Sequence, residues 1–590
     1  MPNKVKELSP QTRDRLKAIM GRERTSVTTS AKIPRRSSAG PAPLSFAQQR
    51  IWFLDQYEPD RPLDNIPLIL KLSGALDVAA LQRALSEVVR RHEALRTRFA
   101  LVGAEPMQLI NAPVEFPLPL IDFCKLPESR GEAEARRFAM IEASQSFDLK
   151  NGPLIRAKLF RFAAAEHALI LTVHHIVSDG WSMGVIFREI ATLYEAYSSG
   201  LSSPLPELPI QYADYAIWQR NWLQGQVLER QLAYWKKQLD SAPEFLDLPT
   251  DYPRPAVLTH AGGRQSFIVP SGLTRTLLEL SRSEGATLFM TLLAVYQTLL
   301  SQFTDQKEVL VGAPISGRNR VETEAVIGVF INTLVLRADF SADPSFRELL
   351  RQVGKTALSA YAHQDLPFDL LVKELRPKRC ADRTLLVQAT FNWQDIQISE
   401  LTGLRLRSLD VGDTHRLEKH EVAHPLRAFQ TNKQTSRFDL TLFMWPQGKE
   451  LRGDLEYNTH LFEAKTIEEL VAQYKILLEA IATNPELRLA DLPSLPKRHR
   501  RRWSSESIWP NPEPKGRAMA QDQAIKRNKF MAAKPRAVST AGLVKRASLH
   551  GATLPLIIEP AIEDVDLVEW TKVNYRALDA ELLQHGALLF

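Results

Sequence analysis

The chain has 590 residues, of which 44% are hydrophobic and 24% are charged. These are ordinary values for a globular protein, and they exclude a chain that is mostly disordered or fibrous. The formal net charge of +7 comes from two flanks, because residues 1–36 carry ten Lys and Arg against three acids and residues 497–546 carry fourteen against three.

The large middle of the chain is therefore mildly acidic, and we expect neither a nucleic-acid nor a membrane partner. The basic run KRHRRR at 497–502 is either a solvated linker or a contact for an anionic surface, and the linker is the interpretation we adopt. The N-terminus lacks the apolar run of a secretory signal, and no window is long enough for a membrane span. We expect a cytoplasmic protein.

The two cysteines, Cys124 and Cys380, lie far apart and have neither a metal-ligand nor a redox spacing. This spacing excludes a disulfide scaffold and predicts free buried thiols in a reducing compartment.

Helical and strand patterns alternate along most of the chain. After a basic helix candidate at 9–24 and a Pro-rich linker, residues 77–96 have apolar side chains at helical spacing, and residues 153–162 and 167–175 have the pattern of strands. A helical, aromatic stretch over 212–235 follows. A second alternation then begins with a buried helix at 287–303. It continues with a strand that enters a turn at 308–318, a further strand at 332–340, and a closing helix at 466–485. The fold class is α/β with two lobes.

Changes in composition set off a basic helix and linker at 1–42, a large α/β body at 43–495, a basic flexible linker at 496–550, and a short region at 551–590 in which strand and helix patterns return.

Two adjacent histidines follow the strand pattern "LILTVHH", and Asp179-Gly180 comes four residues later. Neighbouring side chains of a strand point to opposite faces, so His174 and His175 are expected to have different roles. The pair is either structural or catalytic, because an imidazole at a strand end can hold or accept a proton near neutral pH. Opposed side chains argue against a shared zinc ion. Asp179 could orient an imidazole, pair with a distant arginine, or cap the following helix.

"HHIVSDG" at 174–180 resembles the HHxxxDG signature of the condensation domain of nonribosomal peptide synthetases. Five further segments resemble that family in the same order: SFAQQRIWFL at 45–54, RHEALRTRF at 91–99, YADYAIWQ at 212–219, IGVFINTLVLR at 327–337 and HQDLPFDLLV at 363–372. A later segment, DRTLLVQATFNWQD at 382–395, departs from the usual wording of the family.

The resemblance implies two chloramphenicol-acetyltransferase-like lobes, a first lobe at 43–215 and a second lobe at 216–495, that form a V around a central tunnel. It implies an acyltransferase that moves an acyl or peptidyl group from an upstream carrier-bound thioester to the amine of a downstream carrier-bound aminoacyl thioester. The partners would be upstream and downstream peptidyl carrier proteins and other synthetase modules. The domain itself would bind no metal and no cofactor, because the carriers bring the 4'-phosphopantetheine.

The resemblance also implies roles for individual residues. His175 would be catalytic, as general base or as a group that positions the amine. His174 would be structural, Asp179 a brace for the turn, and Gly180 a donor of a backbone N–H with room for the tethered arm. Arg91 and Arg96 would flank the site, more as scaffold than as substrate contacts. Residues expected to line the tunnel, or to support its wall, are Trp181, Ser316, Arg318 and Asn332.

The residues around HHxxxDG resemble those of the class of condensation domains that joins an L-configured donor residue to an L-configured acceptor. The basic segment before the first lobe is either a docking segment or a plain linker. Residues 551–590 resemble the opening of a TauD-type iron and 2-oxoglutarate dioxygenase, without the iron ligands of that family. We expect a truncated start of such an enzyme, with no oxygenase activity.

Two other functions are compatible with the sequence. One is a noncatalytic domain that docks a carrier near a separate hydroxylase. The other is a stand-alone acyltransferase that uses a free amine or alcohol.

Overall fold

The computed structural model describes residues 32–38, 40–57, 64–377, 380–394, 404–408 and 435–494, and three short strands after them. The chain divides into two compact units, residues 1–507 and residues 508–590. The helix predicted at 9–24 and most of the linker at 496–550 lie outside the described residues.

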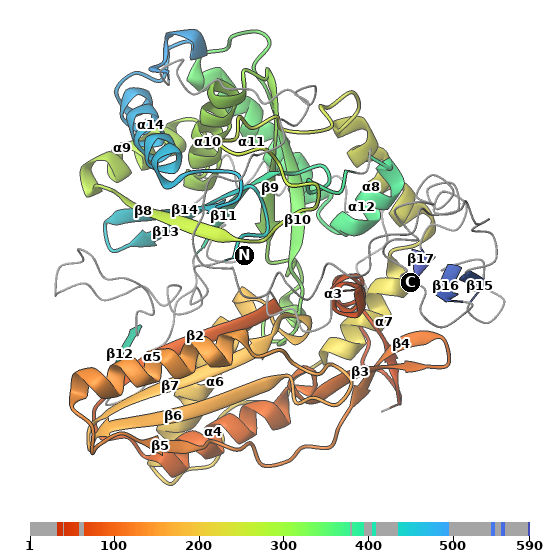
Figure 1. Cartoon of the computed structure of the whole chain (residues 1–590), viewed down its shortest axis with the longest axis vertical. Helices are drawn as coiled ribbons and strands as arrows, with labels where there is room; N and C mark the ends of the chain where they lie inside the picture. Colours follow the sequence, from red (N-terminus) through yellow and green to blue (C-terminus); the bar gives the residue numbers. More distant parts are fainter. Residues whose placement is uncertain are drawn as a thin grey trace, which may run out of the picture. The chain divides into compact units, whose positions relative to one another are not determined.

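The first lobe is built on a five-stranded sheet in the order β12-β2-β7-β6-β5 (Figure 1). Its long strands are β2 (Asn65–Ser73), β6 (Ile155–Ala163) and β7 (Glu166–His174), and its edges are β5 (Leu120–Asp122) and β12 (Arg405–Ser408). The strands predicted at 153–162 and 167–175 are confirmed as β6 and β7.

Helices cover both faces of this sheet. Helices α4 (Val78–Arg91) and α6 (Gly180–Ser198) pack on one face, and α5 (Glu128–Ser144) packs on the other. Helix α4 begins where the Asp77 carboxylate accepts a hydrogen bond from the backbone N–H of Ala80, and the predicted helix at 77–96 ends in a 3₁₀ turn, Glu93–Arg96. A smaller sheet is formed by β1 (Ala42–Pro43), β3 (Thr97–Val102) and β4 (Glu105–Ile110). Helix α3 (Phe46–Tyr57) follows β1 in the chain.

The second lobe contains a six-stranded sheet in the order β10-β9-β11-β13-β14-β8. The aromatic stretch before it forms α7 (Tyr212–Trp222) and α8 (Gly225–Gln238). The strands are β8 (Gly262–Val269), β9 (Glu308–Ile315), β10 (Asn332–Asp339), β11 (Ala389–Trp393), β13 (Leu440–Gln447) and β14 (Glu450–Asn458). The helices are α9 (Ser271–Ser283), α10 (Leu288–Thr304), α11 (Phe346–Ala362), α12 (Phe368–Leu375) and α14 (Ala464–Thr483).

Helices α9, α10, α11 and α14 share one hydrophobic core with this sheet. Among the described residues, no single helix has the length and hydropathy of a membrane span, and only α9 with α10 reach them together, as a pair bent by 103°.

Two pieces of the second lobe's sequence join the first lobe. Strand β12 pairs antiparallel with β2. The connection between β9 and β10, residues 316–331, also enters the first lobe, where it contributes Val326, Ile327, Val329 and Phe330 to the hydrophobic core. We call residues 316–331 the crossing segment. The boundary at 215/216 in the sequence is therefore not a boundary between two independent cores.

The expectation of two buried thiols is wrong. Both cysteines are free among the described residues, but Cys124 is exposed and Cys380 is half-buried. Cys124 lies in the turn after β5, where its backbone N–H donates to Asp122 and the chain runs along the surface. In the second unit, the described residues form β15 (Val544–Ser548), β16 (Leu556–Pro560) and β17 (Leu588–Leu589), which make one small sheet.

The crossing segment predicts a strong effect of Gly328→Ala. A Cβ atom at Gly328 would lie 1.8 Å from Cδ2 of the buried Tyr212 ring, so the substitution must displace that ring or the segment. We expect a loss of about 1–3 kcal/mol in the free energy of unfolding, measured by urea denaturation. Gly354→Ala is the control, because its Cβ would lie 3.9 Å from the sulfur of Met290 inside helix α11, and we expect a gain of about 0.5–1 kcal/mol. Equal stability of the two variants would contradict this packing.

Candidate active site

The two histidines lie on either side of a strand end. Strand β7 ends at His174, and a 3₁₀ turn over His175–Val177 follows it. The side chain of His174 is buried, whereas that of His175 is half-buried. The rings therefore differ in environment, as expected, but the reason is the change from strand to 3₁₀ turn rather than alternation along one strand.

His174 is part of the first lobe's interior. Its Nδ1 accepts a hydrogen bond from the backbone N–H of Ile176 at 3.2 Å, so the ring proton of the neutral form is on Nε2. The ring meets Phe147 edge to face at 5.8 Å between centroids. Burial lowers the pKa of His174 to about 4. A buried, neutral ring fits a structural role.

His175 has the opposite tautomer. Its Nδ1 lies 2.7 Å from the carbonyl oxygen of Ser178. Because a carbonyl only accepts, Nδ1 donates the proton, and Nε2 of the neutral ring carries the lone pair. Burial and then the nearby Arg437 lower the pKa of His175, while Asp64 acts in the opposite direction. Near pH 7 the ring is neutral and its Nε2 can accept a proton.

Asp179 is held by three partners. Its Oδ1 accepts from the backbone N–H of Ser182 at 2.8 Å, so it caps helix α6. The same oxygen lies 3.2 Å from Nη2 of Arg318, and Oδ2 accepts from the backbone N–H of Phe330 at 2.9 Å. Both charged side chains are buried. Of the three roles considered for Asp179, the structure gives it two, helix cap and ion-pair partner.

The crossing segment is fixed to the first lobe by further hydrogen bonds, three of which are donated by first-lobe side chains to its backbone carbonyls. They come from Trp181 Nε1 to the Glu324 carbonyl at 2.9 Å, from Ser182 Oγ to the Gly328 carbonyl at 2.8 Å, and from the Tyr212 hydroxyl to the Val329 carbonyl at 2.6 Å. The turn after the histidine pair is therefore part of a joint between the lobes.

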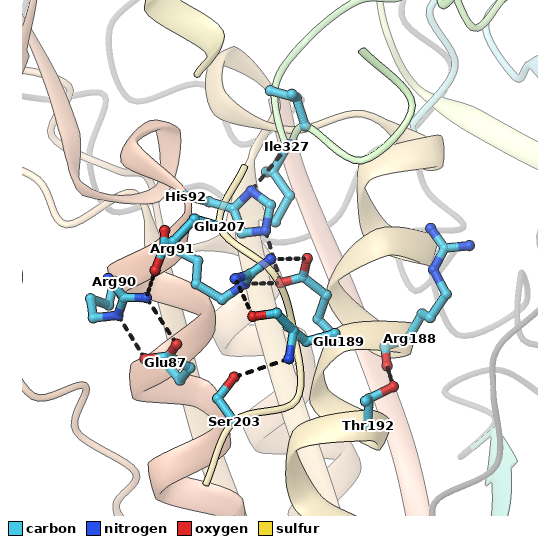
Figure 2. A network of polar contacts seen from close by, with 12 residues as sticks. Glu87, Arg90, Arg91, His92, Arg188, Glu189, Thr192, Ser203, Glu207 and Ile327 are labelled. Atoms are coloured by element: carbon cyan, nitrogen blue, oxygen red, sulfur yellow. Dashed lines mark hydrogen bonds and ion pairs between the residues drawn. The ribbon is translucent and has the colours of Figure 1, made fainter. Parts of the chain in front are cut away.

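Arg91 belongs to a buried network that supports the same segment (Figure 2). It donates through Nε and Nη2 to the Glu189 carboxylate at 3.2 and 3.3 Å. His92 donates from Nε2 to Glu189 at 2.9 Å, and its Nδ1 accepts from the backbone N–H of Ile327 at 3.4 Å. Figure 2 shows how this network joins α4 and α6 to the crossing segment.

The other candidate residues are distributed around this joint. Arg96 is half-buried and donates to the carbonyl of Asn111. Asn332 donates to the carbonyls of Gln364 and Leu366, which lie before α12. Ser316 is half-buried at the start of the crossing segment, and Gly180 is the first residue of α6.

Asp64 and Arg437 lie close to the histidines, and sequence reasoning did not find them. They form an ion pair at 2.5 Å, and both influence the charge state of His175. No local motif marks either residue, since 373 positions separate them in the chain. Among the described residues, no group of three or more His, Cys, Asp or Glu side chains is placed to hold a metal ion.

The buried ion pair gives a test of the joint. Arg318→Met leaves Asp179 unpaired, and Asp179→Asn leaves Arg318 unpaired. We expect each change to cost about 3–5 kcal/mol in the free energy of unfolding, and the double variant to cost clearly less than the sum. Arg137→Met removes an exposed ion pair with Glu134 and is expected to cost less than about 1 kcal/mol. Strictly additive costs in urea denaturation would argue against a coupled pair.

The lowered pKa of His174 makes the free energy of unfolding depend on pH. Its pKa in the folded chain lies below the ordinary value of 6.5, so the unfolded chain takes up this proton first. The stability of the parent should fall by about 3 kcal/mol relative to His174→Asn as the pH drops from about 6.5 to about 4, and no further below that. Unfolding of both proteins at a series of pH values checks this, because titrations that they share cancel. A constant difference would contradict it.

Comparison with known proteins identifies the family to which the chain belongs. Residues 38–502 match the family described as "Condensation domain". One of the linear gramicidin synthase proteins of Brevibacillus parabrevis is 46% identical over 469 residues, which are 79% of this chain and 9% of that protein.

Two solved structures share the fold. The X-domain in complex with OxyB from teicoplanin biosynthesis is 28% identical with a TM-score of 0.65, over 80% of this chain and 99% of that one. The first condensation domain of the calcium-dependent antibiotic synthetase, 22% identical with a TM-score of 0.62 over 78% of this chain and 100% of that one, shows the fold alone. The predicted mixed α/β fold is therefore confirmed, and the chain belongs to the condensation domain family of nonribosomal peptide synthetases.

Proposed function

We propose that this chain forms peptide bonds in nonribosomal peptide synthesis. The donor is an acyl or peptidyl thioester on an upstream carrier protein, and the acceptor is the amine of an aminoacyl thioester on a downstream carrier protein. The observation that carries the proposal is the His175 ring, whose Nδ1–H is held by the Ser178 carbonyl so that Nε2 is ready to accept, within a chain that matches the family over residues 38–502.

The reaction needs one proton to change place. The amine nitrogen bonds to the thioester carbonyl carbon, the carbonyl oxygen becomes an oxyanion, and the carbon–sulfur bond then breaks. The proton that the amine loses ends on the departing thiolate. His175 Nε2 hydrogen-bonds the amine, as general base or as the group that holds its lone pair toward the carbonyl. A thioester is activated, so alignment and proton handling are the main tasks of the protein.

The other site residues support this arrangement. Asp179 and Arg318 fix the turn that carries His175, and Asn332 fixes the chain before α12. Gly180 offers a backbone N–H and space for the tethered arm, and Trp181 and Ser316 line the path of the substrates. The carriers supply the 4'-phosphopantetheine, and the domain needs no cofactor of its own. From the residues around the HHxxxDG motif, we propose an L-configured donor and an L-configured acceptor.

The proposal predicts a large effect of His175→Ala. With loaded donor and acceptor carriers, we expect the rate of condensation to fall about 10²–10⁴-fold, because the amine loses its acceptor group. His460→Ala is the matched control, since His460 is exposed in the second lobe, and it should keep the parent rate. Product formation is measured by mass spectrometry of the upstream and downstream carriers. Equal rates for His175→Ala and the parent would rule out the assigned role.

A second candidate is a noncatalytic docking domain. The complex of the X-domain and OxyB is a case in which a domain of this fold binds another protein. The same assay separates the functions, because binding of a carrier without product favours docking. Turnover with a free amine and no acceptor carrier favours a stand-alone acyltransferase.

A further inference from the structure

An ion pair between the lobes lies beside His175. Asp64 is the residue before β2 in the first lobe, and Arg437 lies shortly before β13 in the second. Oδ1 of Asp64 is 2.5 Å from Nη2 of Arg437. The Asp64 side chain is 13% exposed and that of Arg437 is 45% exposed, so solvent screens this pair only in part.

The register of the sheet places Asp64 next to the histidines. Strands β2 and β7 are antiparallel, and Asn65 is the partner of His174. Asp64 directly precedes Asn65, and His175 directly follows His174, so both residues adjoin the last pair of the ladder. Arg437 is also held, because Asp439, two residues later, is fully buried and pairs with Arg254 at 2.6 Å. The backbone next to Asp64 is therefore held by the sheet, and the backbone next to Arg437 is held by the buried Asp439–Arg254 ion pair.

The charged groups with the largest effect on the pKa of His175 are Arg437 from the second lobe, Asp64 before β2 and Asp179 at the start of α6. The neighbouring His174 on β7 is neutral near pH 7. Helix α3 contributes the uncharged Gln48 amide, which donates to the Ile176 carbonyl. Asp64 and Arg437 are the two that contact each other across the lobes.

The two charges act on His175 in opposite directions. Arg437 lowers the pKa of the imidazole and Asp64 raises it. Although burial raises the pKa of Asp64, Arg437 and both histidines lower it to about 2, so Asp64 is an anion at neutral pH. Each member of the pair therefore offsets the other at the ring.

We propose that Asp64 and Arg437 are positioning residues for His175: their ion pair joins the two lobes beside the imidazole and places there one positive and one negative charge that offset each other. The inference deepens the proposed function and rests on it for its catalytic meaning. The pair itself is a property of the folded chain and can be tested without substrates.

The test is a titration of the His175 ring in the full chain by NMR, with histidine labelled by ¹³C at Cε1 and the signal assigned by its loss in His175→Gln. Asp64→Asn removes the anion that raises the pKa of His175 and keeps the Arg437 cation that lowers it, so this pKa should fall by about half a unit to one unit. Arg437→Met leaves the Asp64 anion unbalanced, and the pKa should rise by a similar amount. Arg437→Lys keeps the charge and should stay near the parent, as should the double variant Asp64→Asn/Arg437→Met.

Asp122→Asn is the matched control. It breaks the ion pair with Arg161 in the same sheet. Arg161 lies opposite His167 in the β6–β7 ladder, at the end of β7 that is far from His174. We expect no change at His175. Shifts in the same direction for Asp64→Asn and Arg437→Met, or shifts no larger than that of the control, would overturn the inference.

The condensation assay separates this inference from the proposed function. If both hold, the acid limb of the rate against pH moves with the titration of His175 in each variant. If the pKa of His175 shifts in opposite directions in Asp64→Asn and Arg437→Met but His175→Ala keeps the parent rate, the proposed function is wrong and the inference about the charges holds. If the pKa of His175 does not shift in opposite directions in these two variants while His175→Ala is inactive, the inference is wrong and the proposed function is unaffected.

Discussion

The joint between the lobes depends on one buried carboxylate. Asp179 caps the helix that follows the histidine turn, pairs with Arg318, and accepts the backbone N–H of Phe330. A buried charge is tolerated only when it is paired and hydrogen-bonded, so the turn cannot shift without leaving Asp179 or Arg318 uncompensated. This constraint fixes the position of His175, four residues before Asp179, relative to a segment that belongs in sequence to the other lobe.

The same joint explains why two identical side chains differ in chemistry. His174 accepts a backbone N–H at Nδ1, and His175 donates from Nδ1 to a backbone carbonyl. The opposite hydrogen bonds select opposite tautomers, and only the His175 tautomer has its basic nitrogen at Nε2. The Arg91–His92–Glu189 network then holds the crossing segment from a second side (Figure 2).

Local patterns in the sequence predicted the elements that local physics decides. The alternating apolar strands and the helices with Asp77 and Asp179 at their N-termini were predicted correctly, because side-chain periodicity and capping act over a few residues. The histidine pair was found from its motif. The partner of Asp179 was expected only as some distant arginine, because the pairing with Arg318 is set by tertiary packing.

Other features lay beyond sequence reasoning for the same reason. The Asp64–Arg437 pair joins positions 373 residues apart, and no periodicity connects them. The exposure of Cys124 follows from the path of one surface turn, which composition does not reveal. The antiparallel pairing of β12 with β2 likewise joins segments that lie far apart in the sequence, which no local pattern relates.

The crossing segment has a consequence for how the protein is made. Val326, Ile327, Val329 and Phe330 fill the core of a lobe whose other members are largely complete by Tyr212. During synthesis the first lobe must therefore wait, with part of its interior unfilled, until residues near 331 have left the ribosome, and Leu404 and strand β12 join it later still. For the same reason, a chimaera that exchanges one lobe between relatives keeps its interior intact only if the crossing segment travels with the lobe that it fills.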